Sequence, residues 1–139
     1  MTSGPQAGAT EIAARKDAPM SFDQLLDRYL AAWNERDADK RRAAVDELWT
    51  AEGTYTDPLA EVRGRAAIDA TIAAVQGQFP DFVFRPGGTF DAHHSIARFT
   101  WELGPADGEA VVVGFDVAVL DDDGRIRDVH GFLDRVPAM

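Results

Sequence analysis

Cysteine is absent from the 139-residue chain, and histidine occurs only three times. The absence of cysteine excludes a disulfide framework, a thiolate nucleophile and a cysteine zinc site. The histidines, His93, His94 and His130, are too few and too scattered to predict a structural metal site. We therefore expect a protein that works without a metal or another cofactor.

Basic residues are also scarce. The 14 Lys and Arg residues stand against 24 Asp and Glu, which gives a formal net charge of -10 and a pI of about 4.6. A nucleic-acid groove or a surface for anionic membranes needs a basic stripe, and none appears. No apolar run approaches the roughly 18 to 20 residues that cross a bilayer, and residues 1–20 lack the apolar centre of a signal peptide. These absences predict a cytoplasmic protein without nucleic-acid or membrane partners.

The residues that are present suffice for one folded domain. Hydrophobic residues make up 45% of the chain, which is enough for a real core at this length. Residues 1–20 are rich in Ala, Gly, Ser and Pro, and we interpret them as a disordered tail. Residues 21–136 contain no repeat and no internal linker, so we expect a single domain there.

Helical periodicity governs the first part of this domain. The tetrapeptide SFDQ is a capping box, and the apolar residues that follow recur at helical spacing, which predicts a helix over about 21–37. A second helix is expected over about 38–51 and should end at Gly53. A third is expected over about 64–77. The stretch TYTDPLAEVRG between the last two helices is interpreted as a crossing segment.

From residue 79 onward the apolar pattern changes to period two. It predicts five strands, which are DFVFR, about 89–94, SIARFTWEL, AVVVGFDVAVL and RIRDVHGFLDRV. The tripeptide PGG is interpreted as the turn between the first two strands. Three helices followed by an antiparallel sheet, in the order αααβββββ, predict an α+β fold.

Three pieces of this sequence resemble the nuclear transport factor 2-like superfamily. They are YLAAW in the first helix, YTDPLAEVRGRAAI at the crossing and GFDVAVLDDDGRI in the late hairpin. The resemblance covers about residues 21–136 and implies a cone-shaped, strongly curved sheet wrapped around N-terminal helices, with a pocket inside. This fold hosts isomerases, cyclases, dehydratases, epoxide hydrolases and binding proteins, so function has to be argued from the site.

Three positions are similar to the catalytic residues of ketosteroid isomerase. In that family a base Asp precedes a Pro in the crossing, and Asp57 of TDP matches it. An oxyanion-binding Tyr on the first helix matches Tyr29, and a protonated Asp before an Asp-rich hairpin matches Asp116. The supporting tyrosines of that family correspond to Trp49 and Ile72 here, which is a departure. SnoaL-like polyketide cyclases look equally similar, and they also use an acidic base in this cavity.

Independently of this resemblance, the residues around Asp116 indicate a pocket. Gly114, Asp116 and Ala118 share one face of a strand, and small residues beside a carboxylate leave space for a ligand. If Asp116 is buried near Asp57, desolvation and the like charge both raise its pKa, and the neutral acid could donate to an oxyanion. The alternative is that Asp116 faces solvent and Gly114 only eases the curvature of the sheet.

Asp57 and Tyr29 also allow two interpretations. An Asp before Pro often only forms a turn, and a Tyr on an apolar helical stripe can be a core residue. In an apolar pocket, however, Asp57 would be a stronger base than in water and could take a proton alpha to a carbonyl. His130 is out of phase with Val129 and Gly131, so we expect it to face away from the pocket.

The inward-facing aromatic residues would line such a pocket and favour a flat, apolar or aromatic ligand. With the small residues of the Asp116 strand, the expected ligand-binding set is Trp33, Trp49, Phe82, Phe84, Phe99, Trp101, Gly114 and Ala118. Limonene-epoxide-hydrolase-like members place an Arg and an Asp at the positions of Gly114 and Gly131. Because both are glycines in this sequence, epoxide hydrolysis is not expected.

Together these residues predict acid–base chemistry on a small apolar carbonyl compound, such as isomerisation or aldol cyclisation. Asp57 would shuttle the proton, while Tyr29 and Asp116 stabilise the enolate oxygen. The alternative is a non-catalytic protein that binds a small molecule in the same pocket. The opposite face of the Asp116 strand is too apolar to stay wet, which predicts a homodimer through the sheets; that face carries Val111, Val113, Phe115, Val117 and Val119.

Overall fold

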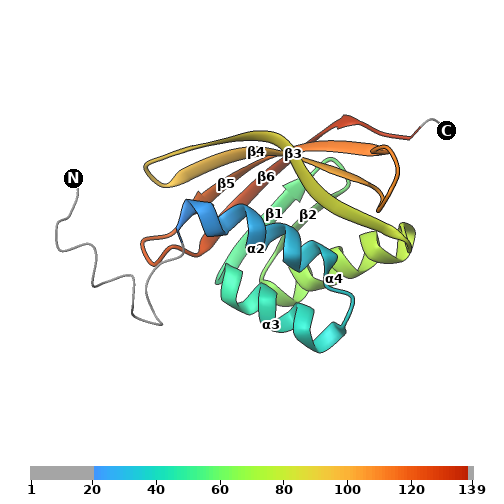
Figure 1. The fold of residues 1–139 in the computed structure, drawn as a ribbon. Coiled ribbons are helices and arrows are strands. Elements are labelled where there is room, and N and C mark those ends of the chain that lie inside the picture. Colours follow the sequence, from blue (N-terminus) through green and yellow to red (C-terminus); the bar gives the residue numbers. More distant parts are fainter. Residues whose placement is uncertain (1–20, 138–139) are drawn as a thin grey trace.

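The computed structural model describes residues 21–137, so the expected tail at residues 1–20 lies outside the described residues. Three helices lie on one side of a curved sheet (Figure 1): α2 (Phe22–Asn34), α3 (Ala38–Leu48) and α4 (Arg65–Gln78). The strands are β1 (Trp49–Asp57), β2 (Ala60–Arg63), β3 (Phe82–His93), β4 (Ile96–Pro105), β5 (Val112–Leu120) and β6 (Ile126–Arg135). Their order in the sheet is β2-β1-β6-β5-β4-β3, which leaves the sheet open at β2 and β3. The expected α+β fold class is confirmed.

Helix α2 begins at the capping box found in the sequence. The Ser21 side chain accepts a hydrogen bond from the Gln24 amide, and the Gln24 side chain accepts one from the Ser21 amide, both at 3.3 Å. The helix ends earlier than expected because Asp37 caps α3 instead, where its side chain accepts from the Lys40 amide at 2.9 Å. The buried stripe of α2 includes Tyr29 and Trp33, so both residues face the sheet side of the helix layer.

The segment interpreted as a crossing is a β-hairpin made by β1 and β2. The second helix was expected to reach residue 51 but ends at Leu48, and Gly53 lies inside β1. The helical prediction failed because β1 pairs with β2 on one side and with β6 on the other, and such long-range pairing overrides local propensity. Gly53 is needed for close packing, since a Cβ there would lie 2.7 Å from Trp49 Cδ1.

The two strands expected around PGG are one strand, β3, with an irregularity in place of the turn. β3 pairs with β4 on both sides of a register shift between Pro86 and Phe90. A Cβ on Gly87 would lie 2.6 Å from Thr100 Oγ1, so glycine allows β3 to pass close over β4. The element order therefore differs from αααβββββ, and the sheet is mixed because β1 and β6 are parallel.

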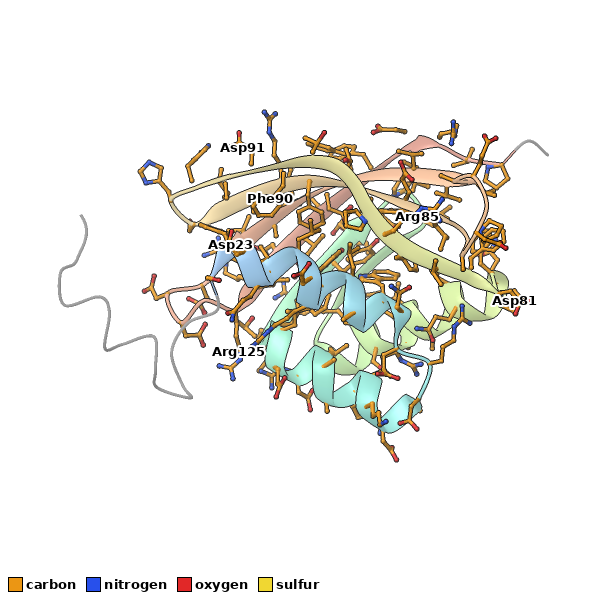
Figure 2. All side chains as sticks on the ribbon, in the orientation of Figure 1. Asp23, Asp81, Arg85, Phe90, Asp91 and Arg125 are labelled. Atoms are coloured by element: carbon orange, nitrogen blue, oxygen red, sulfur yellow. The ribbon has the colours of Figure 1, made fainter. Side chains whose placement is uncertain are left out.

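The core lies between the sheet and the helices. The alternation predicted for β5 is confirmed, because Val112, Gly114, Asp116, Ala118 and Leu120 are all buried. Charged side chains such as those of Asp81, Asp91 and Arg125 lie at the exposed periphery (Figure 2). His130 is exposed, as its phase predicted. Within residues 21–137, no helix combines the length and apolarity needed to cross a membrane.

The outer face of β5 remains a predicted dimer surface. Val113, Phe115, Val117 and Val119 are half-buried in the single chain, and Phe132, which pairs with Phe115, is 56% exposed. We expect this face to pack against a second copy because contiguous apolar surface is costly in water. Sedimentation should give a dimer at micromolar concentration, and Phe132→Asp should favour the monomer. A monomeric wild-type protein would contradict the expectation.

Candidate functional site

Asp57 lies at the end of β1, where it both holds the turn and faces a cavity. Its Oδ1 accepts hydrogen bonds from the amides of Leu59 and Ala60, each at 2.8 Å. Its Oδ2 accepts a hydrogen bond of 2.7 Å from the Tyr55 hydroxyl. The two interpretations of this residue are therefore compatible, because one oxygen closes the β1–β2 turn while the other retains a lone pair.

Asp116 lies in the middle of β5 and is only 2% exposed. The Tyr29 hydroxyl donates to its Oδ2 at 2.7 Å, whereas Oδ1 has no hydrogen-bond partner among the described residues. Burial is the main cause that raises the pKa of Asp116 to about 6. The Tyr29 hydroxyl and the nearby Trp101 indole oppose the shift as donors, and the charge of Asp57 raises the pKa further. Asp116 thus exchanges its proton much closer to neutral pH than an ordinary aspartate.

A glycine on β6 brings the two carboxylates together. Asp116 on β5 pairs with Gly131 on β6. On the other side of β6, Thr56 of β1 pairs with His130, so the next residues along these two strands, Asp57 and Gly131, are also neighbours. A Cβ on Gly131 would lie 2.7 Å from Asp116 Oδ1 and 3.4 Å from Asp57 Cβ. Because Asp116 Oδ1 fills the position that a Gly131 side chain would take, only glycine lets the two acids lie this close on either side of β6.

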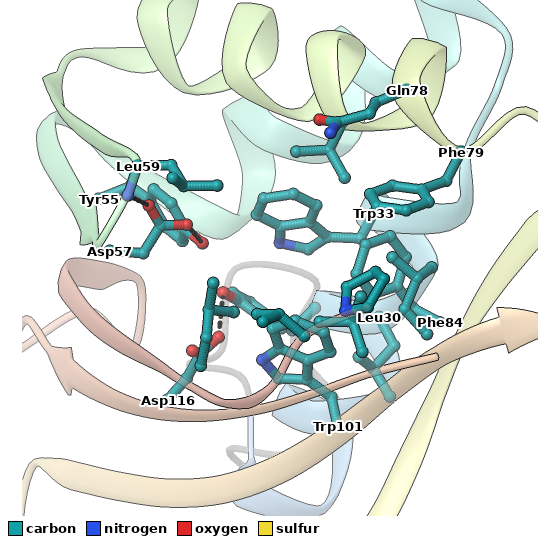
Figure 3. A pocket seen from close by; sticks show the side chains of 17 residues that line it. Leu30, Trp33, Tyr55, Asp57, Leu59, Gln78, Phe79, Phe84, Trp101 and Asp116 are labelled. Atoms are coloured by element: carbon teal, nitrogen blue, oxygen red, sulfur yellow. Dashed lines mark hydrogen bonds between the residues drawn. The ribbon is translucent and has the colours of Figure 1, made fainter. Parts of the chain in front are cut away.

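Both acids line one cavity of about 270 Å³ between the helices and the sheet (Figure 3). The lining is mostly apolar and consists of Tyr29, Leu30, Trp33, Tyr55, Asp57, Leu59, Val75, Gln78, Phe79, Phe84, Trp101, Leu103, Val112, Asp116, Leu133, Val136 and Pro137. Within the described residues, no three His, Asp or Glu side chains gather as a metal site requires. The cavity thus offers two carboxyl groups, two phenols and an apolar body, the composition expected of a site for a small ligand.

Six residues singled out in the sequence line this cavity, namely Tyr29, Asp57, Asp116, Trp33, Phe84 and Trp101. Three of the rings form a continuous wall. The Trp33 and Phe84 centroids are 5.3 Å apart, and those of Phe84 and Trp101 are 5.4 Å apart. The indole Nε1 of Trp33 is buried and has no described hydrogen-bond partner. Trp33 therefore contributes an aromatic surface to the wall, while its indole nitrogen is shielded from the cavity.

The other five residues expected to contact a ligand lie outside the lining. Trp49 and Phe99 are fully buried behind Tyr29, with ring centroids 5.8 Å and 5.2 Å from its ring. Ala118 is also fully buried. Phe82 stacks on the lining residue Phe79, and Gly114 lies beneath the indole of Trp101. Period-two alternation identifies the inward face correctly but cannot tell the core from the cavity wall.

Tyr55 is the site residue that sequence reasoning missed. It is 3% exposed, lines the cavity and donates to Asp57. The signal was present in TYTD, because Tyr55 and Asp57 are two residues apart and share a strand face once the segment is recognised as β. Burial is the largest cause that raises the pKa of both Tyr55 and Tyr29 well above the ordinary value. Both tyrosines are therefore neutral hydrogen-bond donors at physiological pH.

The stability of the fold should depend on the protonation of Asp116. Its folded pKa of about 6 exceeds the ordinary 3.8, so the folded state binds the proton more tightly, and the free energy of unfolding should fall as pH rises between these values. The shift corresponds to about 3 kcal/mol. Asp116→Asn has no carboxyl to ionise and avoids this loss. In urea unfolding, the stability of the variant relative to wild type should therefore increase between about pH 4 and about pH 7.

The matched control for this experiment is Asp46→Asn, because Asp46 is an exposed acid on α3 outside the cavity. We expect its effect on unfolding to change little over the same pH range. If the free energies of unfolding of Asp116→Asn and wild type differ by the same amount at every pH, burial does not raise the pKa of the Asp116 carboxyl.

Comparison with known proteins identifies the family. A model of the SnoaL-like domain matches residues 26–129. Among solved structures, a proposed isomerase of the SnoaL-like family from Agrobacterium tumefaciens str. C58 is 42% identical, with a TM-score of 0.77. That match covers 81% of this chain and 97% of the other chain. No curated protein matches the sequence.

More distant structures share the fold. A proposed polyketide cyclase from Sinorhizobium meliloti is 17% identical over 81% of this chain and 99% of that chain, with a TM-score of 0.62. A nuclear transport factor 2-like protein of unknown function from Cytophaga hutchinsonii is 12% identical over 84% of this chain and 93% of that chain, with a TM-score of 0.63. At these identities the likeness concerns the fold alone. On the family match and the 42% identical relative, the chain belongs to the SnoaL-like domain family.

Proposed function

We propose that the cavity catalyses cofactor-independent proton transfer on a small apolar carbonyl compound. The observation that carries this proposal is the approach of two unlike carboxyl groups across Gly131. Asp57 is held by three hydrogen bonds, whereas Asp116 is buried with one oxygen free. Two relatives bear names that agree with such chemistry, one a proposed isomerase and one a proposed polyketide cyclase.

Asp57 acts as the base. Its Oδ2 accepts one hydrogen bond from Tyr55, and a remaining lone pair takes a proton from the carbon next to the carbonyl. The electron pair of the broken C–H bond moves into the enolate, so charge develops on the carbonyl oxygen. Return of the proton to a different carbon gives an isomer. Attack of the enolate carbon on a second carbonyl of the same molecule forms a carbon–carbon bond and an alkoxide, which takes the proton back from Asp57 and completes an aldol cyclisation.

Asp116 stabilises the enolate oxygen in its protonated form. Because the Tyr29 hydroxyl donates to Oδ2, the acid proton belongs on Oδ1, which has no other described partner. The Oδ1–H group then donates to the developing oxyanion in a cavity from which most water is excluded. Tyr29 acts on the substrate through Asp116, as a positioning residue, rather than by direct donation as the sequence suggested.

Binding of an enolate mimic at different pH tests this assignment. Pentafluorophenolate affinity, corrected for ionisation of the probe, should fall at least about tenfold as pH rises from about 5 to about 8, because ionised Asp116 loses its donor and repels the anion. Asp116→Asn keeps an amide donor and should bind with little pH dependence. Tyr29→Phe should weaken pentafluorophenolate more than pentafluorotoluene, a neutral compound of similar shape.

The second candidate is a non-catalytic small-molecule-binding protein. It is favoured by one observation, since both cavity tyrosines donate to carboxylates of the protein and not into the open space. Equal pentafluorophenolate affinity in wild type, Asp116→Asn, Asp57→Asn and Tyr29→Phe would mean that the cavity holds no oxyanion site. The binding function would then replace the catalytic one.

A further inference from the structure

The charges that line the cavity all have one sign. Asp57 and Asp116 are its two acids, and none of the described lining residues is a lysine, arginine or histidine. The whole chain adds a field of the same sign, with a formal net charge of -10. When both acids are ionised, an anion entering this cavity meets repulsion and no cationic partner, whereas a cation is attracted.

Aromatic rings surround these acids on one side. The rings of Tyr55, Trp33, Phe84 and Trp101 form an arc in which successive centroids lie 5.4, 5.3 and 5.4 Å apart. All four residues line the cavity. Aromatic faces attract ammonium groups, and the attraction grows when the site is shielded from water.

One carboxylate oxygen of Asp116 has no described hydrogen-bond partner, which indicates the kind of group that a ligand would supply. Asp116 is 2% exposed, and its Oδ1 lacks a hydrogen-bond partner among the described residues. A buried carboxylate oxygen in this state is costly, and pairing with a cation offsets part of that cost. Because Asp116 lines the cavity, a ligand there lies beside its carboxyl group, and a rotation of the carboxylate turns Oδ1 toward the ligand without moving the backbone.

We propose that this cavity binds organic cations, in which an ammonium group sits between Asp116 and Asp57 and an apolar body lies along the aromatic arc. The volume of about 270 Å³ restricts the ligand to a small amine or quaternary ammonium compound. This binding does not depend on the proposed proton transfer. It uses the ionised form of Asp116, whereas enolate stabilisation uses the protonated form, so the two activities are separated by their tests.

Three probes of similar shape and different charge test the proposal. They are phenyltrimethylammonium, tert-butylbenzene and benzenesulfonate. Binding is followed at about pH 8 by tryptophan fluorescence, because Trp33 and Trp101 line the cavity. The cation should bind at least about tenfold more tightly than the neutral probe, as expected of shielded cation–aromatic and ion-pair contacts. Benzenesulfonate should bind more weakly than both.

Variants separate the site from the field of the whole protein. Asp116→Asn and Asp57→Asn should each reduce the preference for phenyltrimethylammonium over tert-butylbenzene by several-fold. Asp46→Asn removes the same charge outside the cavity and should leave that preference unchanged. Folding of each variant is checked by thermal unfolding, and the two cavity variants serve as independent tests if one is unstable.

Three results would overturn the proposal. The first is equal or tighter binding of tert-butylbenzene by the wild-type protein. The second is a cation preference that survives in both folded cavity variants. The third is a loss in Asp46→Asn as large as that in Asp116→Asn, which would assign the preference to net charge. None of these results bears on proton transfer, which is tested by pentafluorophenolate binding and by exchange of carbon-bound protons.

Discussion

Asp57→Asn is expected to lower catalysed exchange of carbon-bound protons by about two orders of magnitude or more, the usual scale for loss of a general base. The substitution should leave the fold intact, because an asparagine Oδ1 can still accept from the amides of Leu59 and Ala60. What is lost is the anionic oxygen that takes the proton. The measurement is deuterium incorporation next to the carbonyl of 2-tetralone in D2O, followed by NMR.

Two further variants define the meaning of this result. Tyr55→Phe removes the hydrogen bond to Asp57 Oδ2 but leaves the carboxylate, so the exchange rate should fall less than in Asp57→Asn. Asp46→Asn should have the wild-type rate. If Asp57→Asn retains full activity while Asp46→Asn is also normal, Asp57 only forms the turn and some other group is the base.

Gly114→Ala should cause the largest loss of stability among single methyl additions in the sheet. A Cβ at this position would overlap the six-membered ring of the Trp101 indole, and Trp101 is only 8% exposed. Either the indole leaves its position in the cavity wall or β4 and β5 separate. Overpacking of this kind costs about 1–3 kcal/mol or more. Urea unfolding of the variant measures the loss directly.

A matched glycine substitution and a double variant test whether collision with the Trp101 indole causes the loss of stability in Gly114→Ala. Gly77→Ala adds the same methyl in α4, where nothing lies within 4 Å, and should stabilise by up to about 1 kcal/mol. Combining Gly114→Ala with Trp101→Phe removes the outer ring, so the double variant should be more stable than the sum of the two losses by about 1–2 kcal/mol. Additive losses would point to backbone strain instead.

The parts of the fold that follow from local patterns were predictable. On β5, period two placed Asp116 between two small residues on the buried face, and the structure agrees. The capping box set the start of α2. In both cases the information lies within a few residues of sequence, because side-chain alternation and helix capping are local properties.

The site depended on contacts that no local pattern reveals. Tyr55 was missed because TYTD becomes a strand only through pairing with β2 and β6. Trp49 and Phe99 were assigned to the ligand because an inward aromatic residue looks the same whether a neighbour or open space lies beyond it. The role of Gly131 depends on three strands at once, since it separates Asp116 on β5 from Asp57 on β1.

The parallel pairing of β1 with β6 also sets the order in which the molecule can assemble. Thr54 and Asp128, which join these strands, are 74 residues apart, and Tyr29 and Asp116 are 87 residues apart. Closing such large loops loses chain entropy before the contacts form, which slows folding. The loop closure that brings Asp57 and Asp116 together therefore belongs to the barrier to folding. Relief of their repulsion should accordingly raise the folding rate as well as slow unfolding.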